Sequence, residues 1–220
     1  MKNLFLILLL SSFIIYGQGK NIALISNIES GNNDNLQKLS ILIDSLNNRN
    51  NIDYLIITGN LSYSNDDNDY VLLNELLNTL KFPYAILTGS NDNKNFPYDW
   101  TEYFDKIEGD NLLIENEQFL ITGINSYLPY SKYPHFSIEN LKWLGSILKE
   151  NGKNRSIISI APVPTTSEIS NKDSYLSILK NNNTKILISP AHEKSSSEII
   201  EGIRTIFLQE GFIDSKGNIF

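Results

Sequence analysis

Two stretches of the sequence carry the clearest strand signals. Asp53–Ser64 reads DYLIITGNLSYS, and Phe82–Asn93 reads FPYAILTGSNDN. In each, a short apolar run ends at a Gly that polar residues follow. Short apolar runs bounded by turn residues are typical of buried strands. We therefore predict strands over Asp53–Thr58 and Tyr84–Thr88, with polar residues gathered at their carboxyl ends.

The same pattern continues on both sides of these stretches. Further strands are predicted over Asn21–Ser26, Leu112–Glu115, Gln118–Gly123, Ser156–Ile160, Lys185–Ser189 and Ile203–Leu208. Apolar residues at helical spacing predict helices over Leu36–Asn47, Tyr70–Leu80, Ile138–Lys149 and Tyr175–Leu179. Repeated strand–helix–strand units indicate an α/β fold with largely parallel pairing. Long loops are expected over Asn125–Pro134, Ala161–Asp173 and Ser189–Ser197.

Length and composition indicate one globular domain. The chain has 220 residues, of which 41% are hydrophobic and 20% are charged. Its net charge of -7 argues against a nucleic-acid partner, because such a partner would select for a basic face. The sequence has no cysteine, so neither a disulfide nor a thiolate metal site can form.

The first residues resemble a targeting segment. A positive start at Lys2 precedes the apolar run Leu4–Ile15, and small and polar residues follow it. This run is too short for a comfortable membrane span, which needs about 20 residues. We predict a signal peptide over 1–18, a mature domain over 19–220, and a secreted or periplasmic location. The alternative is an uncleaved leader that anchors the protein to the membrane; no later hydrophobic stretch is long enough to span it.

Chemistry in an open parallel sheet is expected beyond the carboxyl ends of its strands. The residues at these positions are Asn27-Ile28-Glu29, Gly59-Asn60-Leu61, Gly89-Ser90-Asn91-Asp92, Ala161-Pro162-Val163-Pro164 and Pro190-Ala191-His192-Glu193.

The ordered series of strand ends resembles the calcineurin-like metallophosphoesterase family. That family shows Asp-x-His, Gly-Asp, Gly-Asn-His-Asp (or -Glu), a later His and a final Gly-His-x-His. The segments that carry the likeness are ALISNIE, DYLIITGNLSYS, FPYAILTGSNDN, FLITGINSY, FSIENLKWLGSILKE, SIISIAPVP and KILISPAHE, within about Asn21 to Leu208. The resemblance implies a sandwich of two mixed β-sheets flanked by helices. Few residues follow the last motif, so we expect a second sheet that is shortened or completed by a partner.

The resemblance also implies where the family's site residues would fall. Asn27 and Glu29 replace the first Asp and His, Asn60 replaces the bridging Asp, and Ser90 and Asn91 replace the next Asn and His. Asp92 matches its motif, and in the family that carboxylate supports the His more than it binds metal. Ala161 or Pro162 replaces a further His, and Ala191 and Glu193 replace the last His pair, with His192 between them.

These replacements predict the loss of the family's chemistry. Two divalent metals need carboxylates and neutral imidazoles to hold them and to activate a water. We therefore expect no resident cofactor and a pseudoenzyme, in which Asn91 and His192 belong to a vestigial site. The protein would bind an unknown ligand or protein partner through the old cleft, or through Tyr127, Tyr130 and Tyr133 of one loop.

A reduced active site is the alternative. Glu29, Asn60, Asp92 and Glu193 could hold a single metal for weak phosphoester hydrolysis, and weak Ca²⁺, Mg²⁺ or Mn²⁺ binding would accompany it. The acidic segment Asn65–Asp69 superficially resembles a calcium loop but lacks its Gly and terminal Glu. We interpret that segment as a solvated loop that precedes a helix.

Overall fold

The computed structural model describes residues 21–31, 33–63, 67–89, 92, 111–126, 133–165, 169–191, 195–208, 210–213 and 219. The first sheet is built from β1 (Ile22–Ser26), β2 (Tyr54–Gly59), β3 (Tyr84–Thr88) and β10 (Glu210–Ile213). The second contains β4 (Asn111–Glu115), β5 (Phe119–Ile124), β6 (Ser156–Ile160), β7 (Ile186–Pro190), β8 (Ser196–Ile200) and β9 (Ile203–Leu208). The helices are α2 (Asn33–Asn47), α3 (Asp67–Leu77), α5 (Ile138–Asn151) and α6 (Lys172–Asn181).

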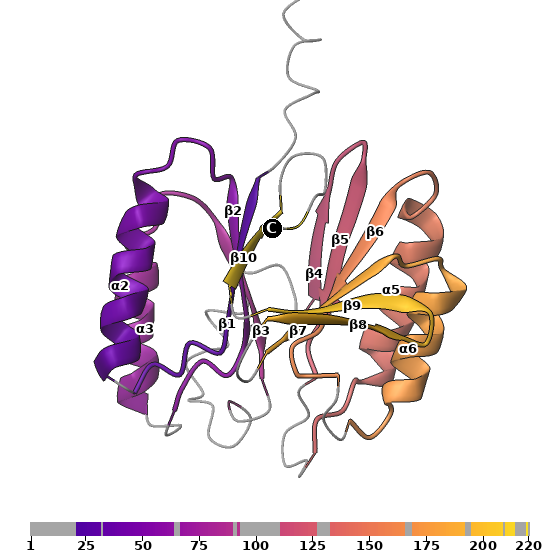
Figure 1. Cartoon of the computed structure of the whole chain (residues 1–220). Coiled ribbons are helices and arrows are strands. Elements are labelled where there is room, and N and C mark those ends of the chain that lie inside the picture. The colour runs from indigo at the N-terminus through magenta and orange to yellow at the C-terminus, as the bar shows by residue number, and fades with distance from the viewer. Residues whose placement is uncertain are drawn as a thin grey trace, which may run out of the picture.

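The described elements form four layers, with the two sheets face to face in the middle (Figure 1). α2 and α3 cover the outer face of the first sheet, and α5 and α6 cover that of the second (Figure 1). The order is β10-β1-β2-β3 in the first sheet and β4-β5-β6-β7-β9-β8 in the second. β1, β2 and β3 are parallel, as are β5, β6, β7 and β9, whereas β10, β4 and β8 pair antiparallel at the edges.

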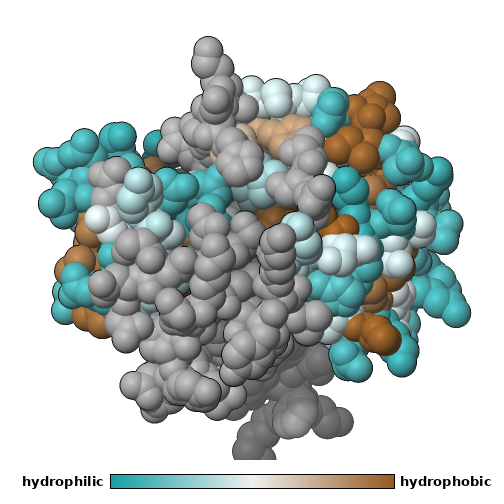
Figure 2. Space-filling model, turned by 90° about the horizontal axis from the view of Figure 1, so that it is seen from below, coloured by the Kyte–Doolittle hydropathy of each residue, from teal (hydrophilic) through white to brown (hydrophobic). Residues whose placement is uncertain are grey.

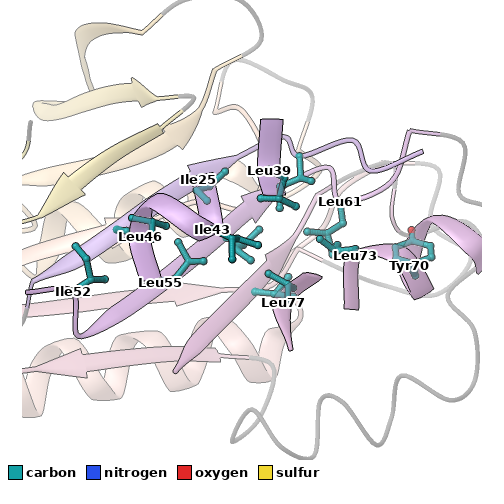
Figure 3. Close-up of a cluster of buried hydrophobic side chains, with 14 residues drawn as sticks. Ile25, Leu39, Ile43, Leu46, Ile52, Leu55, Leu61, Tyr70, Leu73 and Leu77 are labelled. Atoms are coloured by element: carbon teal, nitrogen blue, oxygen red, sulfur yellow. The ribbon is translucent and has the colours of Figure 1, made fainter. Parts of the chain in front are cut away.

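Alternation along the strands gives each sheet two apolar faces. Between the sheets lie mostly Ile and Leu side chains, including Ile56 and Leu87 from the first sheet and Ile121 and Ile158 from the second. On the outer face of the first sheet, Leu39 and Ile43 of α2 pack with buried strand residues (Figure 3). Such close-packed apolar layers account for most of the stability of a globular domain.

The predicted α/β sandwich of two mixed sheets flanked by helices is confirmed. Tyr84–Thr88, Ser156–Ile160 and Ile203–Leu208 form strands with the predicted bounds. Ser137 caps α5, because its side chain accepts a hydrogen bond from the Asn140 backbone N–H.

Several expectations need correction. Helix α3 begins at Asp67, three residues before the predicted start, and ends at Leu77. The loop expected over Ser189–Ser197 is shorter among its described residues, because β7 runs to Pro190 and β8 begins at Ser196. β10 was not predicted. It lies after Leu208 and adds an edge strand to the first sheet. The second sheet contains six strands.

Candidate functional site

The loops that leave β1 and β2 run side by side beyond the sheet. The Asn27 N–H donates to the Thr58 carbonyl at 2.9 Å, and the Glu29 N–H donates to the Asn60 carbonyl at 3.1 Å. The Ser30 N–H then donates to the Leu61 carbonyl at 2.7 Å. The hydrogen-bonded ladder of the parallel strands therefore continues into the loops and fixes the predicted site residues relative to one another.

Backbone conformation at these loops is unusual. Asn27 and Glu29 have φ of 53° and 50°, in the left-handed region that costs a residue other than Gly about 1–2 kcal/mol. Gly59 has φ of 86°, and a Cβ there would lie 2.3 Å from Asn27 Oδ1. The Gly of DYLIITGN is thus required by both its conformation and the close approach of the β1 loop.

The side chain of Asn27 is engaged at both ends of its amide. Its Nδ2 donates to the Ala191 carbonyl at 2.8 Å, across the space between the two sheets. Its Oδ1 accepts from the Asn60 backbone N–H at 3.1 Å. Only an amide fits these two partners, because a carboxylate would face the Ala191 carbonyl with a second acceptor.

Neighbouring strand ends are tied across the sheets in the same manner. Thr58 Oγ1 donates to the Ala161 carbonyl at 2.9 Å, and Ser26 Oγ donates to the Leu208 carbonyl. Asn125 Oδ1, after β5, accepts from both the Thr88 N–H at 2.9 Å and the Thr88 hydroxyl at 3.3 Å. Each parallel strand of the first sheet therefore has at least one hydrogen bond to the second sheet at its carboxyl end.

Asp92 organises the loops after β2 and β3 from inside. Its fully buried carboxylate accepts backbone N–H bonds from Leu61, Ser62 and Gly89 at 2.9–3.2 Å, and a hydroxyl bond from Tyr70 at 3.3 Å. Burial raises the pKa of Asp92 to about 7, and these hydrogen bonds act in the opposite direction by favouring the charged form. The predicted match at Asp92 is therefore a structural support for two loops.

A second buried carboxylate belongs to the same network. Asp69 is buried and accepts a hydrogen bond from the Ser62 hydroxyl, while the Ser30 hydroxyl donates to the Asp69 backbone carbonyl at 3.0 Å. The interpretation of Asn65–Asp69 as a solvated loop was wrong at Asp69, which lies in the first turns of α3. Its acidic neighbours in the sequence hid this role, and no local pattern distinguishes it from them.

A pocket opens beside the β1 loop. Its volume is about 490 Å³, and it lies between the end of β1, the first turns of α2 and Ala191. The polar lining includes Glu29, Asn35 and Lys38, and Leu39 and Leu42 supply an apolar wall. Figure 2 views the molecule from the side on which β1, β2 and β3 end, where the described side chains at the margins are mostly hydrophilic.

The structure brings together some of the predicted site residues. Asn27, Glu29, Asn60 and Ala191 are neighbours, and Asp92 lies beneath them, bonded to the loop that follows Asn60. Ala161 is buried and contributes its carbonyl. Ser90, Asn91, His192 and Glu193, and likewise Tyr127 and Tyr130, lie outside the described residues. Within the described part of the chain, no group of three or more His, Cys, Asp or Glu could hold a metal ion.

Residues 20–196 match the family described as calcineurin-like phosphoesterase. The chain belongs to this family. A curated relative, named probable glycerophosphodiester phosphodiesterase GpdQ, from Arcobacter nitrofigilis, is 27% identical over 124 residues. That match covers 55% of this chain and 45% of the relative, so the chain spans less than half of its length.

Solved structures agree on the fold. The protein TT1561 of Thermus thermophilus has a TM-score of 0.61 at 13% identity, with 92% of this chain and 98% of that chain covered. GAP50, the anchor in the inner membrane complex of Plasmodium, has a TM-score of 0.60 at 13% identity, with coverage of 87% and 71%. At these identities the likeness establishes the fold alone. Among the described helices of this chain, none is long and apolar enough to cross a membrane.

Proposed function

We propose that this calcineurin-like phosphoesterase is a catalytically inactive member of its family that works by binding a ligand or protein partner. The observation that carries the proposal is the pair of hydrogen bonds that the Asn27 side chain makes within the protein. At the position of the family's first metal-binding Asp, its amide donates to Ala191 and accepts from Asn60, so both ends are committed to the protein itself. A metal would have to compete with these hydrogen bonds.

The remaining donors do not fit a pair of divalent metals. Asn60 is neutral at the position of the bridging carboxylate, and Ala161 and Ala191 carry no side-chain donor. Asp92 is fully buried, and both of its oxygens accept backbone N–H bonds. A two-metal site needs several anionic ligands to neutralise its charge.

A weak metal-dependent phosphoesterase is the second candidate. It is favoured by the likeness to the relative named as a phosphodiesterase and by Glu29, which lines the pocket. A single Mn²⁺, Mg²⁺ or Ca²⁺ held by Glu29, Asn60, Asp92 and Glu193 would be its cofactor. The oxygens of Asp92 already accept backbone N–H bonds, so binding would be weak.

Hydrolysis of bis(p-nitrophenyl) phosphate by the purified mature chain tests the choice. We expect no turnover above the buffer rate with Mn²⁺, Zn²⁺, Mg²⁺ or Ca²⁺, and no difference between wild type and Glu29→Ala. Metal-dependent turnover that Glu29→Ala abolishes would favour the second candidate. An Asn27→Asp, Asn60→Asp double variant is the matched control for restored ligands.

Export completes the proposal. The charge and apolar run of residues 1–18 support a cleaved leader and a secreted or periplasmic mature protein, with a membrane-anchored form as the alternative. The acidic net charge supports partners other than nucleic acid. Amino-terminal sequencing of the protein recovered outside the cytoplasm should begin near Gly19, whereas an intact Met1 in the membrane fraction would support the anchor.

A further inference from the structure

The pocket between β1 and α2 presents one charge of each sign. Glu29 lines it from the β1 loop and Lys38 lines it from α2. In the part of the chain that the structure describes, neither side chain takes part in an ion pair. A pocket that held a plain phosphate or carboxylate would present a net positive lining, and this one does not.

Most of the other polar side-chain groups that line the pocket are already hydrogen-bonded within the protein. Ser26 Oγ donates to the Leu208 carbonyl, and both ends of the Asn27 amide are hydrogen-bonded. Asn35 Nδ2 donates to the Glu29 backbone carbonyl at 3.4 Å. The Glu29 carboxylate and the Lys38 ammonium are therefore the charged groups left to meet a ligand at this pocket.

Glu29 is held in place at a cost. Its φ of 50° is strained for a residue with a Cβ, and the Glu29 N–H and carbonyl are fixed by Asn60 and Asn35. A Gly would adopt this conformation without strain. The backbone of Glu29 is therefore fixed relative to the pocket that this residue lines.

The apolar part of the lining sets the rest of the ligand. Leu39 and Leu42 lie on α2 one turn apart, and Ile25 and Ile28 come from the β1 end. A volume of about 490 Å³ lies in the range of small-molecule sites, about 300–1,000 Å³. The pocket therefore combines a short apolar surface with two opposite charges.

We infer that this pocket binds a small zwitterion of the amino-acid type, with its ammonium at Glu29, its carboxylate at Lys38 and its alkyl group on Leu39 and Leu42. The inference deepens the proposed function and rests on it, since it names a ligand class for the strand-end face. It needs no metal and no bond cleavage.

Isothermal titration calorimetry with three matched probes tests it: leucine, isoamylamine, which lacks the carboxylate, and 4-methylpentanoate, which lacks the ammonium. We expect saturable one-site binding of leucine to wild type, and binding about tenfold or more weaker for each single-charge probe. Glu29→Gln and Lys38→Met should each weaken leucine binding by a similar factor.

The two variants should also separate the two charges. Glu29→Gln should leave 4-methylpentanoate binding unchanged, and Lys38→Met should leave isoamylamine binding unchanged. Glu150→Gln and Lys142→Met, exposed on α5, are the matched controls and should bind leucine as wild type does. Equal thermal melting of all five proteins shows that folding is unaffected.

No saturable heat with leucine overturns the inference, as does leucine binding that neither Glu29→Gln nor Lys38→Met weakens. The failure of the inference and the failure of the proposed inactivity are distinguishable. Metal-dependent hydrolysis together with leucine binding would contradict the proposed inactivity and support the pocket assignment. Absence of both hydrolysis and leucine binding would support the proposed inactivity and contradict the pocket assignment.

Discussion

The bodies and the carboxyl ends of the same strands are built in different ways. Between the sheets, the strand bodies meet through Ile and Leu side chains such as Ile56 and Ile158. A few residues further on, the same strands meet through hydrogen bonds from Asn27 and Thr58 to backbone carbonyls of the second sheet. The first region is apolar and does not depend on any single contact. The second region is polar and depends on individual hydrogen-bond donors.

This difference separates stability from chemistry. An apolar layer stabilises the sandwich whatever occupies the strand ends, because burial is roughly proportional to area and is not directional. Hydrogen bonds are directional, so the strand ends hold their geometry only while each donor meets its acceptor. The family fold can therefore persist while the residues at its site change.

Breaking the apolar region should have the largest effect. Ile158 is fully buried between the sheets, and Ile158→Ala should lower the free energy of unfolding by about 2–5 kcal/mol, because it removes buried methyl groups and leaves a cavity. Urea unfolding at pH 7 measures it. Exposed Ile138→Ala on α5 is the control and should cost far less; an equal loss in both variants would contradict the assignment of the core.

Asp92→Asn should have the next largest effect. The Asn side chain would offer an NH₂ group to backbone N–H donors, so at least one of Leu61, Ser62 and Gly89 would lose its acceptor. We expect a loss of about 1–3 kcal/mol, the range for a buried donor left without its acceptor. Urea unfolding at pH 7 measures this loss too, and a variant as stable as wild type would show that the carboxylate does not support the loops.

Asn27→Asp tests the polar region by exchanging one NH₂ group for an oxygen. The substitution restores the family's residue but places a carboxylate oxygen against the Ala191 carbonyl, so we expect a loss of about 1–2 kcal/mol in EDTA. Thr58→Val is the matched control for loss of one inter-sheet bond without a new charge. Thermal unfolding of both in EDTA provides the comparison, and a more stable Asn27→Asp would show that the amide is not required.

The dependence of stability on pH provides a separate test of Asp92. Burial raises the pKa of Asp92 to about 7, so between pH 4 and 7 the folded protein holds a proton that the unfolded chain releases. Stability at this site should therefore be highest below about pH 4 and fall as pH rises towards 7. Urea unfolding at pH 4, 5, 6 and 7 should show a slope that Asp92→Asn removes; an unchanged slope would assign it to other groups.

Most of the fold could be predicted because buried strands of Ile and Leu are strong local signals. β3, β6 and β9 were found with the right bounds for this reason. β8 was missed because its residues, SSEII, are mostly exposed and show no apolar pattern. β10 was missed because four residues, EGFI, acquire strand structure only through pairing with β1.

The location of the site could be predicted from the sequence, but its individual contacts could not. Parallel strands carry their carboxyl ends to one edge, so the meeting of Asn27, Glu29 and Asn60 followed from the order of the strands. The pairing of Asn27 with Ala191 and the burial of Asp69 did not, because both depend on which backbone groups of distant segments face them.

We propose that hydrogen bonds, and not a pair of metal ions, hold the two sheets together at the strand ends. The most direct test is the free energy of unfolding of the mature wild-type protein in EDTA and with added Mn²⁺, Zn²⁺, Mg²⁺ or Ca²⁺. We predict the same value in all five conditions. A metal present at about 100 times its dissociation constant would add about 2.7 kcal/mol, and such a rise with Mn²⁺ or Zn²⁺ would contradict it.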